Sequence, residues 1–259
     1  MAKGFKVKIE GFIIHLQRAT ARRQQVDHLL KELPVKASVV DAVDGQAMSD
    51  DEIASHYVKE LHRPAYPFAL RKSEVACFLS HRKVWRMIVE RGLDAGLIIE
   101  DDVALDVALF GRCFEMGKAA CKGAAYVQFR ISPVRGDVRE VARERDVTLV
   151  APEVSQLGTV AQLVTREAAE QLLALTERFD RPVDTFLQMR WVTDIAPYCV
   201  VPSGISDQSG EIGGSTISAS GKARRGLGER LMREWRRFSY RRQVREYSRG
   251  WSLPELEVE

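Results

Sequence analysis

The chain has 259 residues, of which 45% are hydrophobic and 29% charged, so it can bury a full-sized hydrophobic core and is not itself a disordered tail. Its 39 basic and 36 acidic residues give a formal charge of +3, too weak a bias over the whole chain to imply a polyanionic partner. The charge is nevertheless uneven. Residues 221–249 carry eleven Lys or Arg against three Glu, so a nearly neutral body precedes a basic tail.

Cysteine usage and hydropathy bear on the compartment. The four cysteines form no CxxC pair and are too few to staple a fold of this size, which favours a reduced, intracellular setting. The apolar run of residues 11–14 is stopped by His15, Gln17 and Arg18, so we expect no signal peptide. No stretch approaches the roughly 18 apolar residues of a spanning helix, and we expect none.

The first elements predict a β-α-β start. Residues 5–16 read as a strand, and Thr20 is placed to cap a helix whose apolar positions recur at helical spacing until Pro34. A short strand over 37–40 then leads into the turn of residues 41–45. Strands alternating with helices indicate an α/β layer fold.

A long helix and a buried strand follow. Residues 49–52 are typical of a helix cap, and a Pro- and aromatic-containing loop comes after them. Residues 73–91 predict a helix, and the apolar run 95–99 suits a central strand buried on both faces. The acidic triplet Glu100-Asp101-Asp102 comes directly after that strand.

The later elements complete the layer and lead into the tail. We expect a helix over 107–120, a strand over 124–131, a charged hairpin over 135–146, a strand over 158–165, helices over 166–178 and 182–191, and a strand over 196–201. Residues 203–220 are rich in Gly and Ser and predict a linker. We therefore expect a globular domain over 1–220 and a basic amphipathic tail over 221–259.

The acidic triplet is a candidate metal site. Open α/β sheets place ligands beyond the carboxyl ends of their strands. Three adjacent carboxylates repel one another, so a cation bound between them would stabilise their arrangement. Mg²⁺ and Mn²⁺ take oxygen ligands and bridge readily to a diphosphate. The residues by themselves leave a solvated acidic turn equally open.

Two further clusters are ambiguous when read alone. Arg18, Arg22 and Arg23 lie near a helix N-terminus, where guanidinium and backbone N–H groups suit a phosphate, but a solvated basic helix start looks the same. His81 shares a helix stripe with Cys77 and is more typical of a structural histidine. No Ser-His-Asp or Cys-His order indicates hydrolase chemistry.

The basic tail has an apolar stripe of Leu227, Leu231, Trp235 and Phe238. Basic residues around Trp and Phe anchors are typical of a helix that lies on anionic lipid. A partner-binding arm, a nucleic-acid-binding arm or a solvated helix are the alternatives.

Taken together and in this order, the motifs resemble glycosyltransferase family 25, which includes bacterial lipooligosaccharide galactosyltransferases and collagen galactosyltransferases. The matching stretches are Phe12-Ile-Ile-His-Leu-Gln-Arg-Ala, Val40-Asp-Ala-Val-Asp-Gly45, Ser73-Glu-Val-Ala-Cys-Phe-Leu-Ser-His81 and Leu97-Ile-Ile-Glu-Asp-Asp-Val103, with weaker matches at Leu157-Gly-Thr159 and Pro182-Val-Asp184. They span residues 12–190 in the family's order.

The resemblance implies an α/β fold of GT-A type, with a mixed sheet flanked by helices, a UDP-sugar donor and a divalent metal, Mn²⁺ or Mg²⁺. Asp101 or Asp102 would hold the metal against the donor diphosphate. The residues carried over to the donor site are Arg18, Arg22, Asp44, Gly45, Ser80, His81, Gly158 and Thr159.

The chemistry implied is sugar transfer. Breaking the sugar–phosphate bond builds negative charge on the diphosphate, which a metal stabilises as a Lewis acid. With inversion, a carboxylate takes the proton of the acceptor hydroxyl, and we expect Asp184 to be that base, with Glu74 and Glu100 in reserve. Asp184 could instead only stabilise its helix terminus, and Glu100 only orient the metal ligands. Asp207 and Gln208 are candidates for a further ligand.

The sequence thus predicts a metal-dependent glycosyltransferase that moves a hexose of galactose type from a UDP-sugar to a lipid-linked glycan such as the lipopolysaccharide core. It would be cytoplasmic, on the inner face of a bacterial inner membrane, with residues 222–249 on anionic lipid. One alternative is a non-catalytic nucleotide- or membrane-binding relative. A nuclease or phosphoryl-transfer enzyme would need a second motif that we do not find, so we expect no nucleic-acid partner. The sugar, the acceptor hydroxyl and the oligomeric state stay open.

Overall fold

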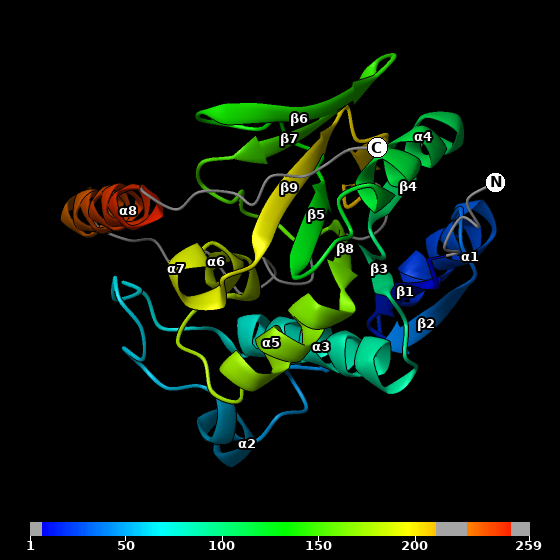
Figure 1. Ribbon diagram of the computed structural model, residues 1–259. Helices are drawn as coiled ribbons and strands as arrows, with labels where there is room; N and C mark the ends of the chain where they lie inside the picture. The colour runs from blue at the N-terminus through cyan, green and yellow to red at the C-terminus, as the bar shows by residue number, and fades with distance from the viewer. Residues whose placement is uncertain (1–6, 211–226, 250–259) are drawn as a thin grey trace.

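An eight-stranded mixed sheet forms the centre of the molecule (Figure 1). The computed structural model describes residues 7–210 and 227–249. In spatial order the strands are β2 (Ala37–Asp41), β1 (Ile9–His15), β3 (Ala95–Glu100), β8 (Ala161–Thr165), β5 (Ala125–Phe129), β9 (Ala196–Val201), β7 (Val147–Pro152) and β6 (Val138–Glu144). Strands β1, β2 and β3 are parallel, as are β5 and β9, while β8 runs antiparallel between β3 and β5. The expected α/β fold with a mixed sheet is confirmed.

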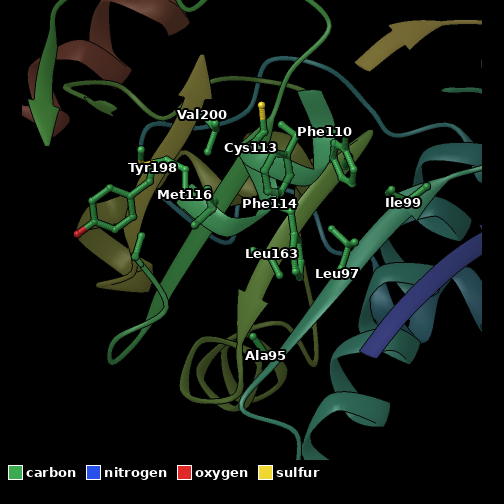
Figure 2. Close-up of a cluster of buried hydrophobic side chains, with 14 of the residues drawn as sticks. Ala95, Leu97, Ile99, Phe110, Cys113, Phe114, Met116, Leu163, Tyr198 and Val200 are labelled. Atoms are coloured by element: carbon green, nitrogen blue, oxygen red, sulfur yellow. The ribbon is translucent and has the colours of Figure 1, made fainter. Parts of the chain in front are cut away.

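Helices cover both faces of the sheet. Helices α1 (Arg23–Glu32) and α4 (Val107–Lys118) pack on one face, and α3 (Lys72–Glu90), α5 (Arg166–Leu175) and α6 (Val183–Leu187) on the other. In β3, Leu97 and Ile99 join the first core and Ile98 joins the second, which explains the unbroken apolar run. Figure 2 shows the first core, where Phe110 and Phe114 of α4 meet the sheet.

Short elements connect the layers. They are the 3-10 turn Thr20–Arg22, α2 (Asp50–His56), α7 (Arg190–Thr193) and a separate antiparallel pair of β4 (Val103–Leu105) with β10 (Ile205–Asp207). Ser49 caps α2 in a full capping box, as its sequence predicts. All four cysteines are free thiols.

Several sequence expectations differ from the structure. Thr20 begins a 3-10 turn without a side-chain cap, and α1 starts only at Arg23. The helix expected over 182–191 is split into α6 and α7, because the turn between them closes with Met189 N donating to Phe186 O. The expected linker contains β10, which pairs with β4, while its residues 211–220 lie outside the described residues. The strand expected to start at 5 begins at Ile9, with 1–6 likewise outside.

The tail forms helix α8 (Leu227–Ser248), which lies beside α7 at the rim of the molecule (Figure 1). Residues 221–226 and 250–259 of the expected tail, and the side chain of Leu227, fall outside the described part. Tyr240 and Val244 are buried against the body. Among the residues that the structure describes, no helix is long and apolar enough to cross a membrane.

Candidate functional site

A pocket lies at the sheet edge where the parallel strands β1 and β3 end, the edge at which α/β sheets bind ligands. It measures about 130 Å³, and a larger hollow of about 450 Å³ between α4 and the end of β9 contains none of the predicted site residues. Nine residues expected at the site line the smaller pocket: Arg18, Arg22, Asp44, Gly45, Ser80, His81, Glu100, Asp101 and Asp102. The fold thus brings together segments that are far apart in sequence.

The carboxylate of Asp101 is buried and contacts two side chains. Arg22 Nη1 donates to its Oδ1 at 2.5 Å, and His15 Nδ1 lies 2.6 Å from its Oδ2. The parallel register of β1 and β3 pairs Ile14 with Glu100, which brings His15 beside Asp101. Both carboxylate oxygens are therefore engaged by side chains, whereas the sequence leads us to expect a metal ligand at this position.

Asp102 is the more open carboxylate. One of its oxygens lies 3.2 Å from Arg22 Nη1, and its side chain is 18% exposed. Burial raises the pKa of Asp102, and the nearby charges of Asp101 and Asp207 add to the increase. Asp207 faces Val103 across the β4–β10 pair, and Gln208 N donates to the Asp102 carbonyl.

These residues fit a divalent cation bound together with a diphosphate. Within the described ranges, no group of three or more His, Cys, Asp or Glu side chains is arranged to hold a metal by itself. Mg²⁺ in nucleotide sites is bound by one or two carboxylates plus phosphate oxygens, without an all-protein cage. Asp102, in the turn between β3 and β4, and Asp207 of β10, which pairs with Val103, are the two carboxylates available for this role.

Glu100 lines the pocket and contacts both Thr159 and His81. Thr159 Oγ1 donates to its Oε1 at 3.0 Å, and His81 Nε2 lies 4.0 Å from the same oxygen. Burial, more than the neighbouring Asp102, raises the pKa of Glu100 to about 7. Burial also lowers the pKa of His81 to about 4, so its imidazole is neutral at neutral pH. Gln162 Nε2 lies 3.2 Å from His81 Nδ1.

The Gly158-Thr159 pair joins two acids. While Thr159 bonds Glu100, Gly158 N donates to Asp184 Oδ2 at 3.2 Å. Thr185 N and Oγ1 both donate to Asp184 Oδ1, at 2.7 and 3.2 Å. Gly158 has φ +98°, a conformation that residues with a side chain rarely adopt. Burial raises the pKa of Asp184, an acid in the first turn of α6 that bonds Gly158 as well as its own helix.

The other wall of the pocket is built by the turn after β2. Arg18 Nε donates to Asp44 Oδ2 at 2.8 Å, and this bond lowers the pKa of Asp44. A Cβ on Gly45 would lie 2.7 Å from the Lys72 carbonyl oxygen, so the turn approaches α3 too closely for a side chain. Ser80 Oγ accepts from Val43 N, which fixes the turn against α3.

Sequence reasoning missed two residues of the site, His15 and Gln162. Both lie in strands: the β1–β3 register puts His15 beside Asp101, and the packing of α3 on the sheet puts His81 beside Gln162. The signal for His15 was its position as a polar residue ending an apolar strand. Glu74, a reserve base, accepts from Arg71 N at 2.7 Å and so caps α3.

Comparison with known proteins identifies the family. Residues 8–187 match the model of Glycosyltransferase family 25 (LPS biosynthesis protein). The chain is 28% identical over 190 residues to procollagen galactosyltransferase 2 of Mus musculus, covering 70% of this chain and 30% of that protein. It is 39% identical over 106 residues to inactive glycosyltransferase 25 family member 3 of Homo sapiens, covering 40% and 18%. The chain thus spans less than a third of the length of these relatives.

Similarity to solved structures is more distant. The crystal structure of a glycosyltransferase involved in the glycosylation of the major capsid of PBCV-1 aligns with 63% of this chain and 62% of that one, at 10% identity and a TM-score of 0.34. The family match is much stronger, since it covers more than half of the chain. On that match, this chain belongs to glycosyltransferase family 25.

Proposed function

We propose that the protein is a metal-dependent glycosyltransferase that moves a hexose from a UDP-sugar to a hydroxyl of a lipid-linked glycan such as the lipopolysaccharide core. A galactose-type sugar is supported by the names of the related procollagen galactosyltransferases. The observation that carries the proposal is the gathering of nine predicted site residues, Glu100 among them, around one pocket. The neighbouring residues Gly158 and Thr159 hydrogen-bond Asp184 and Glu100, which connects the second acid to this site. The proposed setting is the cytoplasmic face of a bacterial inner membrane.

Arg18 and Arg22 supply positive charge to the donor side of the pocket. Arg22 is held in place by Asp101, so its guanidinium is oriented before a diphosphate arrives. Asp102 and Asp207 would hold Mn²⁺ or Mg²⁺ against that diphosphate. When bound, the metal would act as a Lewis acid that stabilises the charge of the leaving group.

Asp184 is the proposed base for an inverting transfer. Its three hydrogen-bond donors stabilise the carboxylate form, while burial raises its pKa and so makes it a better proton acceptor. The acceptor hydroxyl would transfer its proton to Asp184 as its oxygen attacks the anomeric carbon. Glu100 is the second candidate, because its pKa of about 7 allows it to exchange a proton at neutral pH.

Titration calorimetry of UDP with and without Mn²⁺ tests the donor site. We expect binding that requires the metal and is lost in Asp102→Asn, while the exposed control Asp137→Asn binds like the wild type. A UDP affinity that is the same with and without Mn²⁺ and the same in Asp102→Asn would contradict the metal assignment. A screen of UDP-galactose, UDP-glucose and UDP-N-acetylhexosamines with lipopolysaccharide core acceptors then identifies the reaction.

The base is tested by Asp184→Asn. This variant should keep its UDP affinity but lose transfer by at least about 100-fold, a typical contribution of general base catalysis. Unchanged transfer in Asp184→Asn would exclude it as the base, and the same assay on Glu100→Gln tests the alternative.

A non-catalytic nucleotide-binding role is the second candidate function. The observation that favours it is the 39% identity to a human family member named as inactive. UDP binding without transfer or donor hydrolysis across the whole screen would support this role over the enzyme.

A further inference from the structure

Helix α8 has two faces with different environments. Tyr240 and Val244 are 8% and 3% exposed, and Arg181 Nη1 donates to Tyr240 Oη at 2.9 Å. The Tyr247 ring packs against Trp191, with their centroids 5.1 Å apart. These contacts attach the C-terminal half of the helix firmly to the body.

The opposite face exposes an apolar stripe. Leu231, Trp235 and Phe238 are 71%, 64% and 67% exposed, although each is a large apolar side chain. At 3.6 residues per turn, this stripe lies roughly opposite Tyr240 and Val244. Leu231, Trp235 and Phe238 therefore do not pack against the body.

Basic side chains extend along the exposed stripe. From residue 231 to the end of α8 there are six Arg and two Glu. Arg233 and Arg237 lie over the Phe68 ring on the body side. Arg236, Arg241 and Arg245 are exposed and make no ion pair with any described residue.

We propose that the outer stripe of α8, formed by Leu231, Trp235 and Phe238, docks the protein on an anionic lipid bilayer. The apolar side chains would enter the boundary between headgroups and acyl chains, while the arginines contact lipid phosphates. A second copy of this chain is a poorer occupant, because it would bring the exposed arginines of two identical helices together, and their like charges repel. Lipid phosphates complement that charge.

The attachment of α8 also relates the bilayer to the pocket. Tyr240 bonds Arg181, which lies three residues before Asp184 in the segment leading into α6. Docking would hold Asp184 in a constant orientation toward the membrane. This consequence rests on the proposed function, since it matters only if the acceptor is lipid-linked, whereas docking itself does not depend on any reaction.

The test measures vesicle binding of the full chain without substrates. We expect binding to vesicles of phosphatidylcholine mixed with phosphatidylglycerol, no binding to phosphatidylcholine alone, and weaker binding at high salt. Trp235→Ser/Phe238→Ser should weaken binding at least tenfold. Because both side chains are exposed, the circular dichroism and melting temperature of this variant should match those of the wild type.

The matched control is Val107→Ser/Val138→Ser, which removes exposed valines of α4 and β6 that are 50% and 47% exposed. It should bind like the wild type. Brominated lipid chains should quench Trp fluorescence in the wild type but much less in Trp235→Phe, which keeps an apolar anchor.

Several outcomes would overturn the proposal. They are no binding of the wild-type protein to anionic vesicles, full binding of the Trp235→Ser/Phe238→Ser variant, and unchanged fluorescence quenching in Trp235→Phe. Sedimentation that reveals a dimer broken by the double variant would assign the stripe to a second copy instead. UDP binding is measured separately, so failure of docking and failure of the proposed function remain distinguishable.

Discussion

Asp101 and Asp102 are neighbours with opposite predicted roles, and one pair of substitutions separates them. Asp101 and Arg22 have side chains only 6% and 5% exposed, so Asp101→Asn removes the charge partner of a buried guanidinium. Breaking a buried ion pair from one side costs about 3–5 kcal/mol. Asp102, at 3.2 Å from Arg22 Nη1, still compensates part of that charge, which puts the expected loss near the lower limit, about 3 kcal/mol.

For a chain of this size, about 3 kcal/mol corresponds to a melting temperature lower by roughly 6–12 °C. Asp102→Asn should shift it far less, by under about 4 °C, because Asp102 makes one longer contact and its loss relieves repulsion between carboxylates. Differential scanning fluorimetry and urea unfolding in EDTA measure both values without a metal contribution.

A melting temperature of Asp101→Asn within about 2 °C of the wild type, or an equally strong destabilisation of Asp102→Asn, would refute these separate roles. A double-mutant cycle with Arg22→Ala adds a control. Since the two side chains act as a pair, the double variant should be less destabilised than the sum of the single variants.

Three further predictions concern His81, Gly45 and Tyr240. Burial lowers the pKa of His81 from 6.5 to about 4, so as the pH falls the unfolded chain is protonated first and the free energy of unfolding should decrease from about pH 6.5 to 4. In His81→Gln, the free energy of unfolding measured in urea should depend less on pH over that range. The same pH dependence as in the wild type would contradict the assignment. Gly45→Ala places a Cβ 2.7 Å from the Lys72 carbonyl oxygen and should cost about 1–3 kcal/mol in urea unfolding, whereas Gly111→Ala, with open space around its Cβ in α4, should be neutral or stabilising. Tyr240→Phe removes the hydroxyl that accepts from buried Arg181 and should lower stability by about 1 kcal/mol; a melting temperature equal to that of the wild type would argue against this contact.

The sequence by itself determined most of the element order. The uninterrupted apolar run of β3, the helical spacing of α3 and the capping box at Ser49 are local signals, and each appears where expected. The ends of the helices and strands were predicted less accurately, because they depend on tertiary contacts. The strand expected from 158 begins only at Ala161, since the residues before it leave the sheet to contact Glu100 and Asp184.

Only the tertiary structure decided the roles within the site. Asp101 and Asp102 look equivalent in sequence, and the difference comes from the β1–β3 register, which brings His15 to one of them across 86 positions. The hydrogen bond from Gly158 to Asp184 likewise joins two segments 26 residues apart in the chain. In α8, spacing identifies an apolar stripe but not the side that faces the body. That side is determined by Arg181, which lies 59 residues before Tyr240, because hydrogen bonding and packing between distant segments are not encoded in local periodicity.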